Sequence, residues 1–372
     1  MVNKSTIRKV IVAILLLAIG AFLLIPRLFS SAPEQFSIQS DVDFYVVGYH
    51  NIEGYKLKNN TFQKVSDDEV EIVKGQINPV LKRAEISNRY LVFSEEGPPL
   101  GVVGRIVSVD FKTGKINYNK TSDYAFTSSG VGPDYYFTSE ANTDDSFIAV
   151  FDANLKEIDK YIFNDSIITT DFSNDGDYIY FLGTYVKGEG SYPTYLHHFS
   201  FDNKKIQLQN QEILYDHPEF TYFFHDSIVR RHQFYSVSSG YRINATKERV
   251  VLGQVFHYDM ESGRKEFFDL SEVAPVNIFE LNEDLLAIEH ERNDSGKIGF
   301  SLFNVRNHTS HFVDLSQLGL SVETDYLKDI KQIDDNTLLV LAGSKLIEYA
   351  IRENTIMFKK EIDADMFHIW VN

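Results

Sequence analysis

A short hairpin bounded by turn-forming residues recurs seven times along this chain of 372 residues. Its clearest copy is Ile106–Ile116, in which two apolar strands flank a turn containing Asp, Thr and Gly. Such residues supply the side-chain hydrogen bonds and the positive φ that a tight connection between two strands requires. The seven turns are 41 to 59 residues apart and lie near Asn59, Thr113, Asn154, Asn203, Ser262, Asn307 and Glu353. That spacing is typical of a four-stranded propeller blade, so the repeat predicts a ring of small sheets.

A second signal, a polar turn followed by an apolar strand, alternates with the hairpins. Its best copy is Ser173–Phe181, and further copies lie at 87–93, 132–137, 282–288 and 335–341. Two turn signals in each unit give four strands, so the chain after residue 42 is predicted to form an all-β, seven-bladed β-propeller. The 21 Tyr and 29 Phe agree with this fold class, because aromatic side chains pack well on pleated sheets.

Closure of the ring is predicted from the two ends of this domain. The first unit begins with the strand 44–49 and lacks an innermost strand, whereas the chain end, 366–371, is an apolar strand without a blade of its own. Pairing these strands completes seven blades and removes free edges that would promote aggregation. Trp370, the only tryptophan in the chain, is then expected at the closure.

The repeat also resembles known bacterial propellers. Ser173–Phe181 resembles the serine-proline-aspartate-glycine turn and strand of bacterial six- and seven-bladed propellers, with Asn174 in the place of proline. Val109–Lys115 is similar to the hairpin of the YVTN and quinoprotein-like propellers, whose architecture is WD-repeat-like. The resemblance covers most of 43–372 and implies the propeller fold. It implies no particular activity, because many unrelated functions share these motifs.

The N-terminal segment predicts attachment to a membrane. Residues 1–9 hold three basic residues, and residues 10–29 are predominantly apolar and, as a helix, approach the thickness of a bilayer core. The excess of positive charge before the helix places the N-terminus in the cytoplasm. We therefore predict a cytoplasmic segment 1–9, a transmembrane signal-anchor helix 10–29, a stalk 30–42 and an extracytoplasmic propeller. The alternative is a cleaved signal peptide, although Pro33 directly after a cleavage point at Ala32 disfavours it.

Composition limits the partners of the propeller. Residues 31–372 contain 32 of the 36 basic residues and all 53 acidic residues, and this net charge of −21 repels nucleic acids and anionic lipid headgroups. The chain has no cysteine, which excludes disulfides, thiolate metal sites and cysteine nucleophiles. We expect a bacterial cell-surface protein with a protein or cell-envelope partner, no nucleic acid and no cofactor.

Candidate binding residues lie on two segments read as long loops at the mouth of the central channel, 183–195 and 238–246. Exposed Tyr and Arg side chains are common binding anchors because they offer contact area at little entropic cost. His225 joins them, because alternate residues of the predicted innermost strand 222–226 face the channel. The candidates are Tyr185, Tyr192, Tyr195, Tyr241, Arg242 and His225. Alternatively, the tyrosines cover their own blades and His225 is an ordinary packed residue.

Signals for catalysis and metal binding are weak. His225, Asp226 and Ser227 are consecutive on one strand and point alternately to opposite faces, which disfavours a catalytic triad, and the chain has no G-x-S-x-G motif. Residues 171–177 partly resemble a calcium loop, but Leu182 stands where a Glu would complete the coordination. A polar turn is therefore favoured, and we predict no metal site and name no catalytic residue.

The sequence favours a ligand- or protein-binding scaffold module at the cell surface. The alternative is a propeller hydrolase or lyase that acts at the mouth of the central channel. Geometry distinguishes the two, because an apolar, tyrosine-lined mouth favours binding. Catalysis is favoured when three or more of five polar residues converge within metal-binding reach. These five are His225, Asp171, Lys82, Asn277 and His368.

Overall fold

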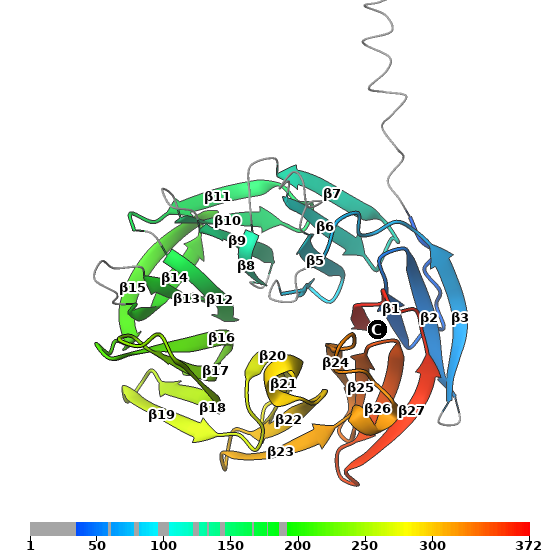
Figure 1. The fold of residues 1–372 in the computed structure, drawn as a ribbon. Coiled ribbons are helices and arrows are strands. Elements are labelled where there is room, and N and C mark those ends of the chain that lie inside the picture. The colour runs from blue at the N-terminus through cyan, green and yellow to red at the C-terminus, as the bar shows by residue number, and fades with distance from the viewer. Residues whose placement is uncertain are drawn as a thin grey trace, which may run out of the picture.

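The structure is a computed structural model that describes residues 35–372 except 59–60, 78–81, 96–103, 122–125, 132–133, 142–145, 166, 177 and 186–191. The described residues form seven antiparallel four-stranded sheets, arranged as the blades of a closed ring (Figure 1). Consecutive strands of a blade pair with one another from the centre of the ring to its rim. This arrangement confirms the all-β, seven-bladed propeller predicted from the repeat.

Each blade has an innermost strand at the centre of the ring and an outermost strand at its rim. In this order, blade 1 consists of β28 (His368–Val371), β1 (Phe44–Val47), β2 (Asn51–Lys58) and β3 (Thr61–Glu69). Blade 2 consists of β4 (Ala84–Ile86), β5 (Tyr90–Glu95), β6 (Gly104–Asp110) and β7 (Ile116–Thr121). Blade 3 consists of β8 (Phe126–Val131), β9 (Tyr135–Ala141), β10 (Ser146–Asp152) and β11 (Glu157–Ile162). Blade 4 consists of β12 (Ile167–Asp175), β13 (Tyr178–Tyr185), β14 (Thr194–Asp202) and β15 (Lys205–Tyr215).

The remaining three blades follow the same order. Blade 5 consists of β16 (Phe220–Arg230), β17 (Gln233–Ile243), β18 (Arg249–Asp259) and β19 (Arg264–Asp269). Blade 6 consists of β20 (Pro275–Asn282), β21 (Leu285–His290), β22 (Gly299–Asn304) and β23 (Thr309–Asp314). Blade 7 consists of β24 (Leu327–Asp334), β25 (Thr337–Ala342), β26 (Lys345–Ala350) and β27 (Thr355–Glu361). The short helix α2 (Arg292–Ser295) joins β21 to β22, and the 3-10 helix η2 (Ser316–Leu318) lies between blades 6 and 7.

Each predicted hairpin turn lies between the third and the outermost strand of a blade. Asn59 itself is outside the described residues, but Lys58 and Thr61 pair on either side of it. In the copy at 106–116, Gly114 has φ +74°, and a Cβ atom there would lie 2.0 Å from the carbonyl oxygen of Phe36. Only glycine combines this backbone conformation with so close an approach of another segment.

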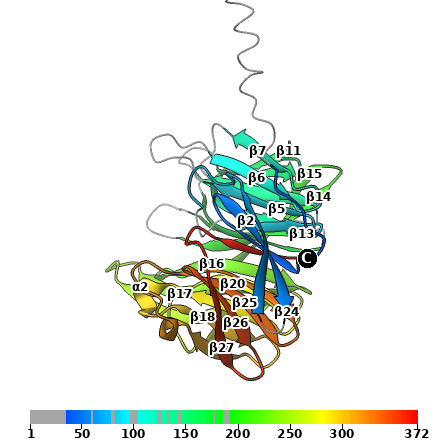
Figure 2. The same ribbon diagram turned by 90° about the vertical axis from the view of Figure 1, so that its right-hand side faces the viewer.

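The two ends of the ring carry different connections. We call one end the turn face, because it carries these hairpin turns and the turns between the first and second strands of the blades. The other end, the loop face, carries the connections between blades and the loops between the second and third strands. Figure 2 shows the ring from the side, with α2 at one end and the C-terminus at the other. Ligand sites of propellers are expected where the connections vary most, and in this ring that is the loop face.

The predicted closure is confirmed. The strand β28 pairs with β1 in a register that runs from Phe44 opposite Val371 to Val47 opposite His368. Trp370 stacks on Phe111 of blade 2, with ring centroids 4.2 Å apart and ring planes at 3°. The last strand of the chain therefore joins blade 1 and also contacts its neighbour, which ties the two ends of the domain together.

The predicted anchor, 10–29, the cytoplasmic segment 1–9 and the first part of the predicted stalk lie outside the described residues. Within the described part of the chain, no helix is long and apolar enough to cross a membrane. From Gln35 onward, the predicted stalk packs on the propeller. Phe36 is 2% exposed, its ring contacts that of Phe111 with centroids 5.5 Å apart, and its N–H donates to the carbonyl of Gly114 over 2.9 Å. The described part of the segment predicted as a stalk therefore contacts blade 2.

Candidate binding site at the loop face

The centre of the ring is bridged by a lysine that contacts two other blades. Lys82, which precedes β4, places its Nζ 2.9 Å from Asp171 Oδ2 on β12 and 2.7 Å from Asp226 Oδ1 on β16. The same ammonium donates to the carbonyls of Phe172 and Ser227. Burial disfavours its charge, but the two carboxylates raise the pKa of Lys82 above its usual value. Burial and the neighbouring charge of Asp226 raise the pKa of Asp171, although the ammonium of Lys82 acts in the opposite direction.

A second polar cluster joins blades 7, 1 and 2. Nδ1 of His368 on β28 lies 2.7 Å from Asp329 Oδ2, and its Nε2 lies 3.2 Å from Glu85 Oε1. Lys331 forms an ion pair with the same Glu85. Burial alone would raise the pKa of the Glu85 carboxyl, but His368 and Lys331 lower it to about 2. This cluster therefore holds its carboxylates ionised at neutral pH.

A carboxylate on one innermost strand repeatedly accepts the backbone N–H of the next blade. This device positions neighbouring blades, because it satisfies a buried backbone donor that belongs to no sheet ladder of its own blade. It recurs in three places, from Ser227 to Asp171 over 2.7 Å, from Ile278 to Asp226 over 2.8 Å and from Ile369 to Asp329 over 2.8 Å. These three carboxylates at the centre of the ring thus hold neighbouring blades together.

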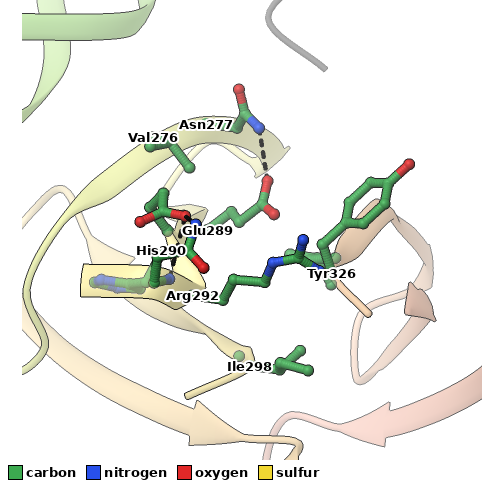
Figure 3. Close-up of a pocket in the computed structure, with 11 residues that line it drawn as sticks. Val276, Asn277, Glu289, His290, Arg292, Ile298 and Tyr326 are labelled. Atoms are coloured by element: carbon green, nitrogen blue, oxygen red, sulfur yellow. Dashed lines mark hydrogen bonds between the residues drawn. The ribbon is translucent and has the colours of Figure 1, made fainter. Parts of the chain in front are cut away.

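A cavity of about 380 Å³ lies at the loop face between blades 6 and 7. Its walls come from the start of β20, the end of β21, α2, the start of β22 and the residues that lead into β24. Val276, Ile298 and Leu327 give it an apolar side, and Figure 3 shows Arg292 extending toward Tyr326 across it. Asn277 also lines a smaller cavity of about 240 Å³ in the centre of the ring, so the two cavities adjoin.

Two glutamates line the larger cavity, Glu289 and Glu291, and Glu289 is the buried one, with 7% exposure. Asn277 Nδ2 donates to its Oε2 over 2.6 Å, as Figure 3 shows. Within the described part of the chain, Glu289 forms no ion pair. Burial, together with the charges of Asp226 and Glu291, raises the pKa of Glu289 to about 7, although Asn277 and the guanidinium of Arg83 oppose this shift. Glu289 therefore changes its charge near neutral pH.

His290 lines the same cavity but is held by the fold. Its Nδ1 lies 2.8 Å from the carbonyl of Val273 and its Nε2 2.8 Å from the hydroxyl of Ser301. Burial lowers the pKa of this imidazole, so it stays neutral at pH 7. With both ring nitrogens engaged, His290 shapes the cavity wall and has no free group to offer a ligand.

Of the six predicted binding residues, two pack in blade 4, Tyr185 as a buried and Tyr195 as a partly buried residue. Tyr185 is 5% exposed, and its hydroxyl lies 2.8 Å from His197 Nε2. Tyr195 packs against the ring of Tyr185 with centroids 4.7 Å apart. The segment 183–195 was read as one long loop, but β13 extends to Tyr185 and β14 begins at Thr194, because Thr184 and Thr194 pair across the two strands.

Three further predicted residues lie toward the loop face of blades 4 and 5, and two of them are in contact. The guanidinium of Arg242 lies over the ring of Tyr192, 4.9 Å from its centroid. Tyr241 contacts Tyr222 and Phe220, with ring centroids 5.3 and 5.0 Å apart. Arg242 and Tyr241 lie in β17, which continues to residue 243, so the predicted loop 238–246 is also shorter than expected. The sequence had placed these residues in loops, and whether they bind a ligand or a partner stays a prediction.

The sixth residue, His225, lies on the innermost strand β16 as predicted. Its Nε2 lies 2.8 Å from the hydroxyl of Ser239 on β17. Burial, reinforced by the charge of Arg249, lowers the pKa of His225 to about 4. Its neighbour Asp226 is the residue that forms the ion pair with Lys82. Register shifts in this part of β16 interrupt the alternation on which the prediction was based.

The five polar residues chosen to test for catalysis converge only in part. Lys82 pairs with Asp171, and Lys82, Asn277 and His368 line one cavity, whereas His225 binds Ser239. In the described part of the chain, no group of three or more His, Asp or Glu side chains is arranged to hold a metal ion. Lys82 and His368 instead form ion pairs with carboxylates of other blades.

Apart from Asn277, the sequence did not single out the residues of the cavity between blades 6 and 7. Glu289 directly follows the recognised strand 282–288, and Arg292 lies in a short polar segment that was not counted among the long loops. A usable signal was the run of seven polar residues at 289–295 directly after the apolar strand 285–288. Tyr326 stands nearly 40 residues further on, so only the fold shows that it faces them.

Comparison with solved structures agrees with the fold. A proposed 6-phosphogluconolactonase from Bacteroides uniformis ATCC 8492 is 10% identical, with a TM-score of 0.54 over 89% of this chain and 99% of that one. A protein of the same description from Bacteroides fragilis NCTC 9343 is 12% identical, with a TM-score of 0.53 over 90% and 98%. Cobalt-substituted Synechocystis ACO is 11% identical, with a TM-score of 0.52 over 92% and 95%. At such identities the likeness shows the fold alone. No protein-family model matches the chain, and no curated protein matches it by sequence.

Proposed function

We propose that this protein is a membrane-anchored, extracytoplasmic propeller that binds a ligand or a protein partner at its loop face. The observation that carries the proposal is the cavity of about 380 Å³ between blades 6 and 7. It combines an apolar wall with a few polar groups, which is the usual composition of a ligand site. By contrast, the carboxylates in the centre of the ring mostly join blades to one another.

The way the chain enters the propeller supports an orientation for this anchored form. Gln35 pairs with Lys115, and Phe36 with Gly114, next to a hairpin turn of the turn face. Between the predicted anchor, 10–29, and Gln35 there are only the residues 30–34, which can reach at most about 17 Å. We infer that the turn face lies toward the membrane and the loop face, with its cavity, points away from it.

Partner capture from the native membrane tests the proposal. The full chain with Val276→Trp, which fills the cavity, is compared with unmodified chain after crosslinking and pull-down. Ile162→Trp is the matched control, because Ile162 is 58% exposed on the outermost strand β11. We expect the partner or ligand to be lost with the cavity variant and kept with the control. Equal capture by all three proteins contradicts binding at this cavity.

A propeller hydrolase or lyase is the second candidate, and Glu289 is the observation that favours it. A buried carboxyl whose pKa is about 7 is suited to general acid–base catalysis near neutral pH. Glu289→Gln separates the two functions, since it removes proton transfer and preserves the shape of the cavity. Loss of ligand turnover with retained ligand binding supports the enzyme, whereas absence of any turnover by the unmodified protein supports the binding module.

A further inference from the structure

Three cations near this cavity form no ion pair with a carboxylate among the described residues: Arg292 lines the cavity, Arg83 lines the adjoining central cavity, and Lys328 is buried next to Leu327 of the cavity wall. Arg83, which precedes β4, donates to the carbonyl of Lys328. Arg292 donates from Nη1 to the carbonyl of Asp325 over 2.6 Å, and Lys328 donates from Nζ to the carbonyl of Ala364. Backbone carbonyls carry no net charge, and carboxylates act on these cations only without ion-pair contact: Glu289 and Asp329 on Arg83, and Asp325 and Asp365 on Lys328. Cations without a carboxylate in direct contact can pair with an anionic ligand.

The side chain of Tyr326 brings these cations together. The guanidinium of Arg292 lies 5.9 Å and the ammonium of Lys328 5.7 Å from the centroid of its ring. Burial raises the pKa of the Tyr326 phenol, while the positive charges of Arg83 and Arg292 act against the shift. Tyr326 is nevertheless 39% exposed and lines the cavity, so its ring and hydroxyl remain accessible to a ligand.

We propose that the cavity binds a small organic anion, with its carboxylate or phosphate oxygens directed at Arg292 and Arg83 and its body against Tyr326 and the apolar wall. This inference rests on the proposed function and specifies the ligand class of the same site. A guanidinium with free N–H groups is the side chain best suited to a carboxylate or a phosphate, because its planar fork matches the oxyanion. Asn277 and Glu289 are then placed to contact the polar groups of the ligand.

The charge of Glu289 makes this binding depend on pH. The charged and polar groups that act on its carboxyl are Asn277 of β20, Arg83, Asp226 of β16, Glu291 and Tyr326. Above its pKa of about 7, Glu289 carries a negative charge that repels an anion, and below it the carboxyl can donate a hydrogen bond. Burial lowers the pKa of Lys328 to about 8, so acidification also preserves this positive charge. Both groups predict tighter anion binding at pH 6 than at pH 8.

Four probes that share the glucose ring and differ in one substituent and its charge test the inference on the full chain in detergent. Glucuronate and glucose 6-phosphate are the anionic probes, glucose is the neutral probe and glucosamine is the cationic probe. At pH 6 we expect at least one anionic probe to bind tenfold more tightly than glucose, and glucosamine to bind no more tightly than glucose. Glucuronate is used for the comparison of pH 6 with pH 8, because a phosphate monoester itself changes charge in this range.

Variants assign the effect to the site. Arg292→Gln and Arg83→Gln should each weaken glucuronate binding at least fivefold, whereas Arg306→Gln, on the turn face, should leave it unchanged. Glu289→Gln should bind glucuronate at pH 8 more tightly than the unmodified protein does at pH 8, and only the weaker pH dependence due to Lys328 should remain. The inference is overturned if neither anionic probe binds more tightly than glucose, or if no probe binds. Glucose bound as well as glucuronate, with loss in the Val276→Trp variant, leaves the proposed binding function standing and rejects only the anionic ligand.

Discussion

Replacing Lys82 by methionine should destabilise the whole ring, because Lys82 neutralises two carboxylates from two other blades. The side chain of Asp171 is 3% exposed and that of Asp226 10% exposed, so removal of the ammonium leaves two facing negative charges with little access to water. Breaking a buried ion pair by removing one partner costs about 3–5 kcal/mol. Lys82 keeps 25% of its side-chain surface exposed, and we therefore expect the lower end, about 3 kcal/mol at pH 7.5.

Urea unfolding followed by the fluorescence of Trp370 measures this loss. Trp370 is the only tryptophan and stacks on Phe111 at the closure of the ring, so its emission reports on the integrity of the ring. With a slope of about 3 kcal/mol per molar urea, a loss of about 3 kcal/mol lowers the midpoint by about 1 M. Lys205→Met is the matched control, because Lys205 pairs with Asp159 at the surface and is 65% exposed. This variant should lose less than about 1 kcal/mol.

The pH dependence of the Lys82→Met variant provides a second arm. Without the ammonium, the facing carboxylates bind a proton more readily in the folded than in the unfolded protein, so their pKa in the folded state is raised. The destabilisation should therefore be greatest at neutral pH and should diminish as the pH falls toward 5. A midpoint no lower than that of Lys205→Met, or a deficit that stays constant from pH 7.5 to pH 5, would refute the reasoning.

Three further predictions concern the closure of the ring, the stability at low pH and the pair Tyr192–Arg242. Truncation from Phe367 onward removes β28, and we expect an insoluble or protease-sensitive product, whereas a soluble, cooperatively folded one contradicts the closure. The pKa of Glu85 is lowered to about 2 in the folded protein. The ionised carboxylate therefore contributes to stability above about pH 4.5, and this contribution is lost as the pH falls toward 2. In Glu85→Gln, the urea midpoint should therefore depend less on pH between about pH 4.5 and pH 2. An unchanged pH dependence of the midpoint contradicts the stabilising role of the Glu85 carboxylate. Tyr192→Ala and Arg242→Gln should reduce partner capture without lowering the urea midpoint, because this pair lies at the loop face of blades 4 and 5. Unchanged capture excludes a role of the pair in binding.

The propeller could be predicted because its instructions are local and repeated. A turn such as the one at Asp110–Gly114 needs only neighbouring residues to form, and Asp110 indeed accepts from the N–H of Lys112 and the hydroxyl of Thr113. The closure was predictable because two unpaired strands at the ends of a ring have only each other as partners. Loop boundaries were less well predicted, because pairing between strands extends β13, β14 and β17 into polar segments that look like loops.

The site was less accessible to sequence reasoning, since it is assembled from distant segments. Tyr192 and Arg242 were predicted on two separate loops, and the fold brings the guanidinium of Arg242, which lies in β17, over the ring of Tyr192. Tyr185 belongs to the same sequence pattern, yet it is buried with its hydroxyl on His197. An alternating pattern cannot tell a tyrosine that faces solvent from one that ends a buried strand.

The amino-acid sequence alone was sufficient for the fold class, the number of blades, the position of the hairpins and the strand that closes the ring. These follow from turn chemistry and from a period in hydrophobicity, both of which act over a few residues. The tertiary structure decided which charges meet. Lys82 reaches Asp171 across 89 residues of chain, and Glu289 acquires a pKa of about 7 from burial and from carboxylates on other segments. Electrostatic energies depend on distance and on access to water, which only the folded ring determines.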